Sequence, residues 1–267
     1  MFVFDGQFWK SSLLEAEAAR HAFSTRLGGI SALPHTASMN VGFGRGDSDE
    51  TVRRNMKILC GAADLPFESL IGSPQYHASD VRYVTEENCG EGIIKDNPFP
   101  SDGYITDRRG VSFIIRTADC VPILLSAKKE DGSPVVGAAH AGWKGTVNLI
   151  AKNLTDAALS LGAVKETLTA AIGPCIRACC FEVKEDFIEA VTSLRGKDFA
   201  ARHISSGNGT YHADLVAMNR EILLASGVRE TRLDVCAECT ACDPERYHSH
   251  RATRGVRGTM GSVVGIV

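Results

Sequence analysis

Three short apolar runs in the middle of the chain limit the folds that are open to it. The runs are SFIIR (112–116), VPILLS (121–126) and PVVGAAH (134–140), and polar residues or Gly and Pro turns separate them. Their length and β-branched content predict buried strands, and Asp131-Gly132 predicts a hairpin between the second and the third. Strands joined by hairpins argue against a dinucleotide-binding fold with one parallel sheet.

Amphipathic segments accompany these strands. We expect helices that begin at the acidic residues 47–50, that run from about 145 to 161 with Gly162 as the stop, and that cover 184–194 and 213–224. Further strands are predicted at 81–84, 167–173, 232–236 and 262–267. Because no internal repeat or low-complexity linker divides the chain, we expect one domain over residues 1–267, of α/β (α+β) class with mixed sheets.

Composition narrows the classes of protein further. The formal charge of −3 argues against broad nucleic-acid or membrane binding, and no run of 18 apolar residues predicts a transmembrane helix. The first ten residues lack the features of a signal peptide. Nine cysteines therefore predict free thiols and metal ligation rather than a disulfide framework. We expect a cytoplasmic protein.

Two strong metal ligands, Cys120 and His140, stand at the ends of predicted strands. A catalytic zinc site takes three protein ligands and keeps one position for water or substrate. The best third candidate is His77 in GSPQYHASDV, between a Ser73-Pro74 turn and a predicted strand. The alternative is that His77 lies in a surface loop, His140 is a hydrogen-bonded core histidine and Cys120 is a core cysteine. Residue types alone leave both interpretations open.

A resemblance to a known family favours the metal. The chain resembles the YfiH-like family, also called the laccase-domain or multicopper polyphenol oxidase family and associated with purine nucleoside phosphorylase activity. The resemblance spans nearly the whole chain and rests on FSTRLGG (23–29), SMNVG (38–42), the QYH of 75–77, TADCVPILL (117–125), HAGWKGT (140–146), GPCIRACCFEV (173–183) and CT (239–240). It implies one zinc ion on His77, Cys120 and His140, and α/β/β/α layers shared with the deamidase domain of cytotoxic necrotizing factor.

The sequence departs from the family pattern in two places. Tyr76 and Ala78 flank the first histidine, where the family often has Val and Gly. The segment YHSHRATRG (247–255) replaces an aromatic-Ser-aromatic-Arg-Arg segment. The second difference puts in doubt the substrate contacts of that region, but leaves the three metal ligands unaffected.

The function that the resemblance implies is a zinc-dependent purine nucleoside phosphorylase. Its partners would be phosphate and adenosine, inosine, guanosine or methylthioadenosine. Phosphate would attack C1′ of the ribose, which requires cationic or backbone donors for the anion. The candidates for phosphate and substrate binding are Arg26, Arg116, Lys144, the helix start at Gly145, and Asn40 of the SMNVG segment.

Other reactions of the same residues remain open. In an adenosine deaminase, activated water would attack C6 while Asp119 or Glu182 carries a proton, although a turn or strand-end cap is the more ordinary role for Asp119. In a thiol hydrolase or deamidase, Cys120 and His140 would form a nucleophile–base pair. Sequence leaves the choice between these reactions, and a non-enzymatic interaction module, to experiment.

The copper-oxidase hypothesis has less support in the sequence. A trinuclear copper cluster requires several His-x-His pairs, and the chain offers only His248-Ser249-His250 among its eight histidines. Adventitious copper binding at the zinc ligands is still expected, because copper binds such donors more tightly than zinc.

A cysteine-rich tail with Cys236, Cys239 and Cys242 is the remaining motif. It could hold a second metal, but burial or a reducible Cys239–Cys242 contact is the more ordinary interpretation. The sequence does not determine whether the protein is a monomer or a small homo-oligomer.

Overall fold

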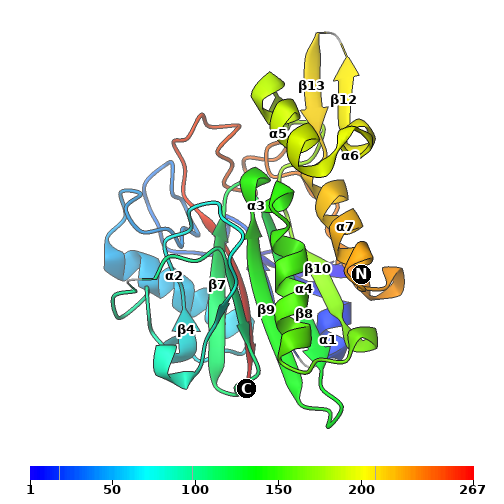
Figure 1. Cartoon of the computed structure of the whole chain (residues 1–267). Helices are drawn as coiled ribbons and strands as arrows, with labels where there is room; N and C mark the ends of the chain where they lie inside the picture. Colours follow the sequence, from blue (N-terminus) through cyan, green and yellow to red (C-terminus); the bar gives the residue numbers. More distant parts are fainter. Residues whose placement is uncertain (18, 98, 208) are drawn as a thin grey trace.

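Two mixed β-sheets pack face to face in the computed structural model and carry helices on both outer faces (Figure 1). The structure describes residues 1–17, 19–97, 99–207 and 209–267. The first sheet has the order β1 (Phe2–Phe4), β2 (Phe8–Ser11), β3 (Arg20–Ser24), β15 (Met260–Ile266), β7 (Val111–Thr117), β4 (Leu70–Ile71). The second has the order β14 (Leu233–Val235), β10 (Thr169–Ile172), β8 (Val121–Lys128), β9 (Pro134–Ala141), β6 (Gly103–Thr106), β5 (Arg82–Tyr83).

The helices complete the layers. They are α1 (Ser12–Ala16), α2 (Asp49–Ala62), α3 (Trp143–Val147), α4 (Ile150–Ser160), α5 (Glu185–Arg195), α6 (Lys197–His203) and α7 (Leu215–Ala225), with short 3₁₀ turns at Phe67–Ser69, Glu86–Asn88, Lys165–Thr167 and Glu230–Arg232. Helix α2 covers the first sheet, and α4 and α7 lie on the second (Figure 1). A small third sheet, β11 (Glu182–Val183), β13 (Thr210–Ala213) and β12 (Ile204–Gly207), extends one end of the molecule together with α5 and α6.

The central strands are apolar throughout because both of their faces are covered. In β7, Ile114 packs with Met56 of α2, whereas the neighbouring Phe113 lies between the sheets. In β8, Leu124 lies between the sheets, whereas Ile123 faces the helices of the second sheet. Successive side chains of a strand point to opposite faces, so a strand between two layers needs apolar residues at every position. The arrangement confirms the expected α/β/β/α layers.

The predicted hairpin is present, but the first two apolar runs are not paired with each other. Strands β8 and β9 form an antiparallel ladder, and Gly132 in their turn has φ +83°, a backbone conformation that suits glycine. In contrast, β7 belongs to the first sheet and β8 to the second. The turn 118–120 therefore carries the chain from one sheet to the other, and Asp119 makes this change of direction with φ 90°.

The structure divides one predicted helix in two and moves the start of another. The predicted helix over 145–161 is two helices, because Leu149 adopts the left-handed conformation with φ 67° between α3 and α4. Helix α2 is capped by Ser48, whose side chain accepts from the Thr51 N–H, while the Asp47 carboxylate accepts from Ser31 instead. The stop at Gly162 and the predicted helices that became α5 and α7 are confirmed.

In the part of the chain that the structure describes, no helix has the length and apolar character needed to cross a bilayer.

Candidate metal centre and cavity

The turn that crosses between the sheets positions Cys120. The residue directly follows Asp119 and precedes β8. The Asp119 carboxylate is buried and accepts from Thr240 Oγ1 at 2.7 Å and from the Arg251 N–H at 2.6 Å. The left-handed turn is thus held in place by the C-terminal segment, and Cys120 lies at a fixed point beside it.

Strand register places His140 next to Cys120. In the β8/β9 ladder, Val121 pairs with Ala141 and Pro122 with His140, so the end of β9 lies beside the start of β8. His140 is buried, and its Nδ1 lies 2.6 Å from Asp102 Oδ1. Since an ionised carboxylate only accepts, Nδ1 carries the proton and the Nε2 lone pair is available to a metal.

Asp102 connects His140 to the loop that carries His77. Its fully buried carboxylate accepts from the backbone N–H groups of Tyr76 at 3.0 Å, His77 at 3.1 Å and Ala78 at 2.8 Å. Burial alone would raise the pKa of Asp102, but the His140 and backbone hydrogen bonds hold it below its usual range. One carboxylate therefore orients two of the predicted ligands.

Close backbone approach lets the His77 ring reach the site. His77 has φ 65°, and a Cβ added to Gly142 would meet its imidazole ring. A Cβ on Gly145 would meet the Ala78 carbonyl oxygen at 2.7 Å. The glycines of HAGWKG therefore allow the start of α3 to pack closely against the QYH loop.

Together His77, Cys120 and His140 form a three-donor group, called here the His–Cys–His group. Their ligand atoms all lie within 4.8 Å of one another, and the two imidazole centroids are 4.7 Å apart. Burial opposes ionisation of Cys120, yet the charge and hydrogen bond of His140 lower its pKa to about 6. Burial likewise disfavours the imidazolium, but the Cys120 thiolate and Asp102 raise the pKa of His140 to about 9. A thiolate beside two imidazoles is a donor set that fits zinc, with three protein ligands as in catalytic sites.

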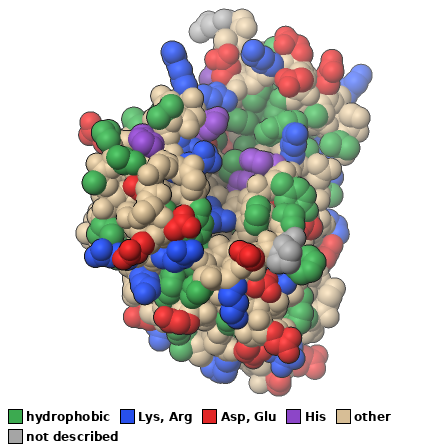
Figure 2. All heavy atoms as spheres, turned by 90° about the vertical axis from the view of Figure 1, so that its left-hand side faces the viewer, with side chains coloured by type: hydrophobic (Ala, Val, Ile, Leu, Met, Phe, Trp, Pro, Cys, Tyr) green, Lys and Arg blue, Asp and Glu red, His purple; other side chains and the backbone are tan. Residues whose placement is uncertain are grey.

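The group lies in the wall of a cavity of about 710 Å³. Figure 2 shows this hollow, with histidine and basic side chains gathered around it and apolar side chains along one side. Its apolar lining includes Phe43, Trp143, Ile176, Phe181 and Leu215. The volume falls within the range of small-molecule sites, which is roughly 300–1,000 Å³.

Basic side chains form much of the remaining lining: Arg45, Arg53, Lys95, Arg116, Arg251 and Arg257. Arg116 lies over the Phe43 ring and donates from Nη2 to the Ser73 carbonyl at 2.5 Å. Burial lowers the pKa of Arg116, and burial together with the nearby Arg45 charge lowers that of Arg257. Among the described residues neither Arg116 nor Arg257 forms a salt bridge, and Arg257 Nε is buried without a hydrogen-bond partner. Two guanidinium groups of the cavity, those of Arg116 and Arg257, are therefore without a carboxylate at salt-bridge distance among the described residues.

Three other predicted substrate contacts lie outside the lining of this cavity. Arg26 donates to the carbonyls of Pro34, Ala37 and Pro244, so its guanidinium holds two loops together. Asn40 is buried, donates to Gly42 O and Asp47, and accepts from the Gly42 and Thr259 N–H groups. Lys144 is exposed beside the Trp143 ring. Of the three predicted basic contacts, Arg26, Arg116 and Lys144, only Arg116 lines the cavity that contains the His–Cys–His group.

The sequence did not single out Asp102, Arg257 or Arg251. Asp102 directly precedes β6, and it faces His140 only because β6 pairs with β9. Arg251 belongs to the segment 247–255 that departs from the family pattern, and Arg257 follows that segment by two residues. The only sequence signal for them was the number of arginines in this part of the chain. In the same segment His248 is buried and bonded to the Met39 carbonyl, whereas the exposed His250 lines the cavity.

The fold and site define a mixed α/β protein whose Cys–His–His centre opens into a basic cavity. Residues 20–267 match the family described as multi-copper polyphenol oxidoreductase laccase. The chain belongs to this family, which confirms the expected resemblance.

Relatives and solved structures extend over almost all of the chain. It is 30% identical to purine nucleoside phosphorylase YlmD of Bacillus subtilis over 97% of this chain and 93% of that protein. It is 35% identical to a purine nucleoside phosphorylase of Deinococcus radiodurans, over 93% of this chain and 90% of that protein. Another relative, 29% identical over 86% of this chain and 87% of that protein, is adenosine deaminase RL5 from an unknown prokaryotic organism. The crystal structure of YfiH from Bacillus licheniformis superposes with a TM-score of 0.89 at 28% identity, and covers 100% of this chain and 99% of that one.

Proposed function

We propose that the protein is a zinc-dependent purine nucleoside phosphorylase that converts adenosine, inosine, guanosine or methylthioadenosine and phosphate to free base and ribose 1-phosphate. One observation carries the proposal: the His–Cys–His group shares its cavity with Arg116 and Arg257, which are partly buried and form no salt bridge with any described residue. Two relatives that are purine nucleoside phosphorylases, from Bacillus subtilis and Deinococcus radiodurans, support the same activity.

Arg116 and Arg257 are the proposed phosphate ligands. A buried charge without a counterion is costly, and a bound phosphate supplies both negative charge and several acceptor oxygens. Arg257 Nε is a buried donor that lacks a protein acceptor, and Arg116 uses one nitrogen on Ser73 and keeps others for a ligand. Arg45 and Arg251 add positive charge to the same cavity.

The apolar side of the cavity suits the nucleoside. Phe181 and Trp143 offer aromatic surface against which a purine can pack, and both belong to one aromatic cluster around Phe187. With the base on this side and phosphate at Arg116 and Arg257, the ribose C1′ would lie between them.

In this reaction a phosphate oxygen forms a bond to C1′ as the C1′–N9 bond breaks. The base leaves with the electron pair of that bond and takes up a proton from solvent. Arg116 and Arg257 would orient the attacking phosphate and offset its charge, while the apolar side chains of the cavity would limit access of water to that side. Zinc held by His77, Cys120 and His140 supplies Lewis-acid polarisation of a substrate oxygen when bound. Asp102 keeps the His140 proton on Nδ1 throughout.

Asp119 has a positioning role in this proposal. Both of its carboxylate oxygens accept hydrogen bonds, from Thr240 Oγ1 and from the Arg251 backbone N–H, so we assign Asp119 to holding the Cys120 turn. Adenosine deamination therefore stands as a second activity, motivated by the relative named adenosine deaminase.

The thiol-hydrolase alternative depends on the metal-free state. The Cys120–His140 contact would form an ion pair suited to nucleophilic chemistry, but His77 adds a third donor and makes metal binding the favoured state. Copper would bind the same donors adventitiously.

The deciding experiment measures base and ammonia release from adenosine and inosine, with and without phosphate, in zinc-loaded and chelator-treated protein. The proposal expects phosphate-dependent base release that chelation abolishes and zinc restores. Ammonia release without phosphate would instead identify a deaminase, and activity that survives chelation would identify thiol chemistry.

A further inference from the structure

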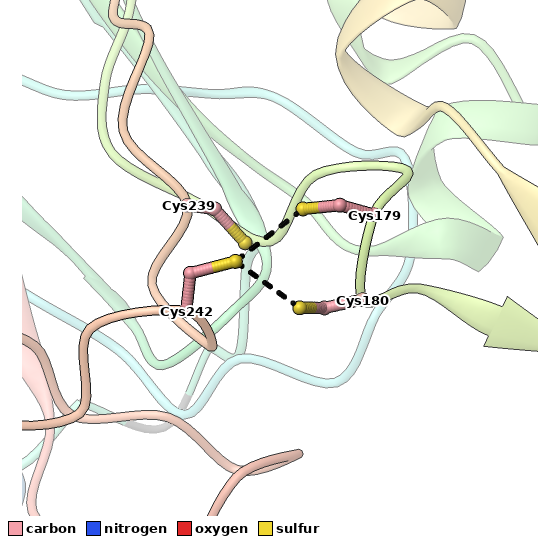
Figure 3. Close-up of side chains that lie close together, drawn as sticks. All are labelled: Cys179, Cys180, Cys239 and Cys242. Atoms are coloured by element: carbon pink, nitrogen blue, oxygen red, sulfur yellow. Dashed lines mark hydrogen bonds between the residues drawn. The ribbon is translucent and has the colours of Figure 1, made fainter.

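Four cysteines outside the cavity lining converge on one point. Cys179 and Cys180 lie in the turn before β11, and Cys239 and Cys242 lie in the loop after β14. All four sulfurs are within 4.8 Å of one another, and Cys242 Sγ is 3.5 Å from Cys179 Sγ and 3.4 Å from Cys180 Sγ. Figure 3 shows the four side chains pointing toward one another from the two loops. We call them the four-cysteine group.

Burial does not explain this group. Cysteines that act as small apolar side chains are hidden, as Cys60, Cys175 and Cys236 are here. Cys179 and Cys242 are exposed, and the other two are only partly buried. The sequence suggested Cys236, Cys239 and Cys242 as a possible metal motif. In the structure Cys236 is not part of the group, and Cys179 and Cys180 join Cys239 and Cys242 instead.

The spacing of the sulfurs matches one metal ion. In a tetrahedral site with Zn–S bonds of about 2.3 Å, neighbouring sulfurs lie about 3.8 Å apart. An iron–sulfur cluster has several irons and sulfides between its thiolates, so some of its ligand sulfurs would lie well beyond the 4.8 Å seen here. A disulfide requires about 2.05 Å between sulfurs, and it joins two cysteines rather than four.

The surrounding backbone suits thiolates. The Arg177 N–H donates to Cys239 Sγ at 3.4 Å, and the N–H groups of Ala241 and Cys242 lie close enough to stabilise the same sulfur. Arg251 donates to the Cys180 carbonyl at 2.8 Å, which brings a positive charge next to the group. Backbone donors and nearby positive charge are what a site of four thiolates needs to offset its negative charge.

We propose that Cys179, Cys180, Cys239 and Cys242 form a second metal site, a closed tetrathiolate site for zinc, separate from the His–Cys–His group. The site joins two segments that are about sixty residues apart, of which the first lines the cavity through Phe181 and the second holds a residue of its wall, Asp119. Phe181 follows Cys180 directly, and Thr240, between Cys239 and Cys242, holds the Asp119 carboxylate. The metal would therefore brace the wall around the first site, a consequence that rests on the proposed function.

The test measures the number of zinc ions per chain in reduced, full-length protein by inductively coupled plasma mass spectrometry. The proposal expects two zinc ions per chain in the wild type, one after Cys179→Ser with Cys242→Ser, and one after His77→Ala with Cys120→Ala. Cys89→Ser, a cysteine in neither group, is the matched control and should keep two.

A second measurement needs no variant, so it holds even if the double variant fails to fold. In wild-type protein, zinc should protect all four cysteines from alkylation, and chelation should expose them together, as peptide mass mapping would record. Cobalt loading of the wild type should add the visible absorption of a tetrathiolate site. As a separate check with a single variant, Cys179→Ser should remove that absorption.

Several outcomes would overturn the second site. They are a single zinc ion per chain that disappears with His77→Ala and Cys120→Ala, iron with stoichiometric sulfide, or disulfides among the four cysteines under reducing conditions. These results are independent of turnover. A protein with two zinc ions and no phosphorolysis would refute the proposed function while supporting the four-cysteine site.

Discussion

Replacing Asp102 by Asn tests how the His–Cys–His group is held. The change keeps the size of the side chain but puts an NH₂ group in place of one oxygen. If the remaining oxygen serves Tyr76 and Ala78, the NH₂ group faces the His77 N–H and the His140 Nδ1–H, which both need an acceptor. Hydrogen bonds to a charged group contribute about 1.5–3 kcal/mol each, so the two lost contacts amount to roughly 3–6 kcal/mol.

The free energy lost with these two hydrogen bonds lowers both the stability of the folded protein and its affinity for the metal. His140 can avoid the donor–donor conflict by moving its proton to Nε2, but it then loses the lone pair that binds the metal. We expect Asp102→Asn to lower zinc affinity about 10–100-fold, as measured by competition with a chromogenic chelator. The metal-free protein should lose on the order of 5–10 °C in melting temperature, for a loss of a few kcal/mol in a chain of this size.

The matched control is Asp234→Asn. Asp234 is also buried, but its carboxylate serves Ser11 and the N-terminal ammonium rather than the metal group. It should lower the melting temperature while zinc affinity stays within about twofold of the wild type. Equal losses of zinc affinity in the two variants, or wild-type affinity in Asp102→Asn, would refute the role assigned to Asp102.

The remaining predictions concern the anion site, the thiol, acid stability and cooperativity. Arg257→Met should raise the KM for phosphate about 10–100-fold, the loss of one charged hydrogen bond, with little change for the nucleoside; exposed Arg54→Met is the control, and steady-state kinetics decides. In chelator-treated protein, alkylation of Cys120 should have a midpoint near pH 6, and zinc should block it; a midpoint near 9 would contradict the ion pair with His140. Burial lowers the pKa of His248 to about 3 from 6.5, so its contribution to stability is present above pH 6.5 and is lost as the pH falls toward 3. About 2 kcal/mol should disappear between pH 7 and pH 5, and denaturant titrations of wild type and His248→Gln should differ in this slope. Finally, residues 1–267 should unfold in one calorimetric transition if they form a single domain; two separate transitions would argue for two.

The sequence predicts the fold and the metal ligands for the same physical reason. Strands covered on both faces must be apolar throughout, so a sequence shows where each strand begins and ends. Cys120 directly precedes one such strand and His140 lies at the end of another. His77 could be predicted as the third candidate ligand because histidine is a common zinc ligand and this one lies in a loop between a turn and a predicted strand. The crossing of the chain between sheets at Asp119 was not predictable, since a pattern of apolar runs does not say which strands pair.

The contacts of the basic residues could not be predicted in the same way. Arg26 and Lys144 lie close to glycines in the sequence, like anion-binding residues, but one carbonyl that Arg26 contacts belongs to Pro244, which only the folded chain brings near it. Asp102 acquires its role from the pairing of β6 with β9, which its local sequence does not specify. Leu149 shows the limit for helices, because the apolar periodicity continues across a left-handed residue that breaks the helix.

The connections that pass between the two sheets carry two of the three donors. His77 lies between β4 of the first sheet and β5 of the second, and Cys120 lies between β7 and β8, while His140 ends β9. A change in the distance between the two sheets would therefore change the distances between the three donor atoms. Reciprocity follows: an ion bound there resists separation of the sheets, and a volume change at Phe113 between them should alter affinity for the ion. With zinc bound at the His–Cys–His group as proposed, coordination chemistry as well as packing would limit core substitutions in this protein.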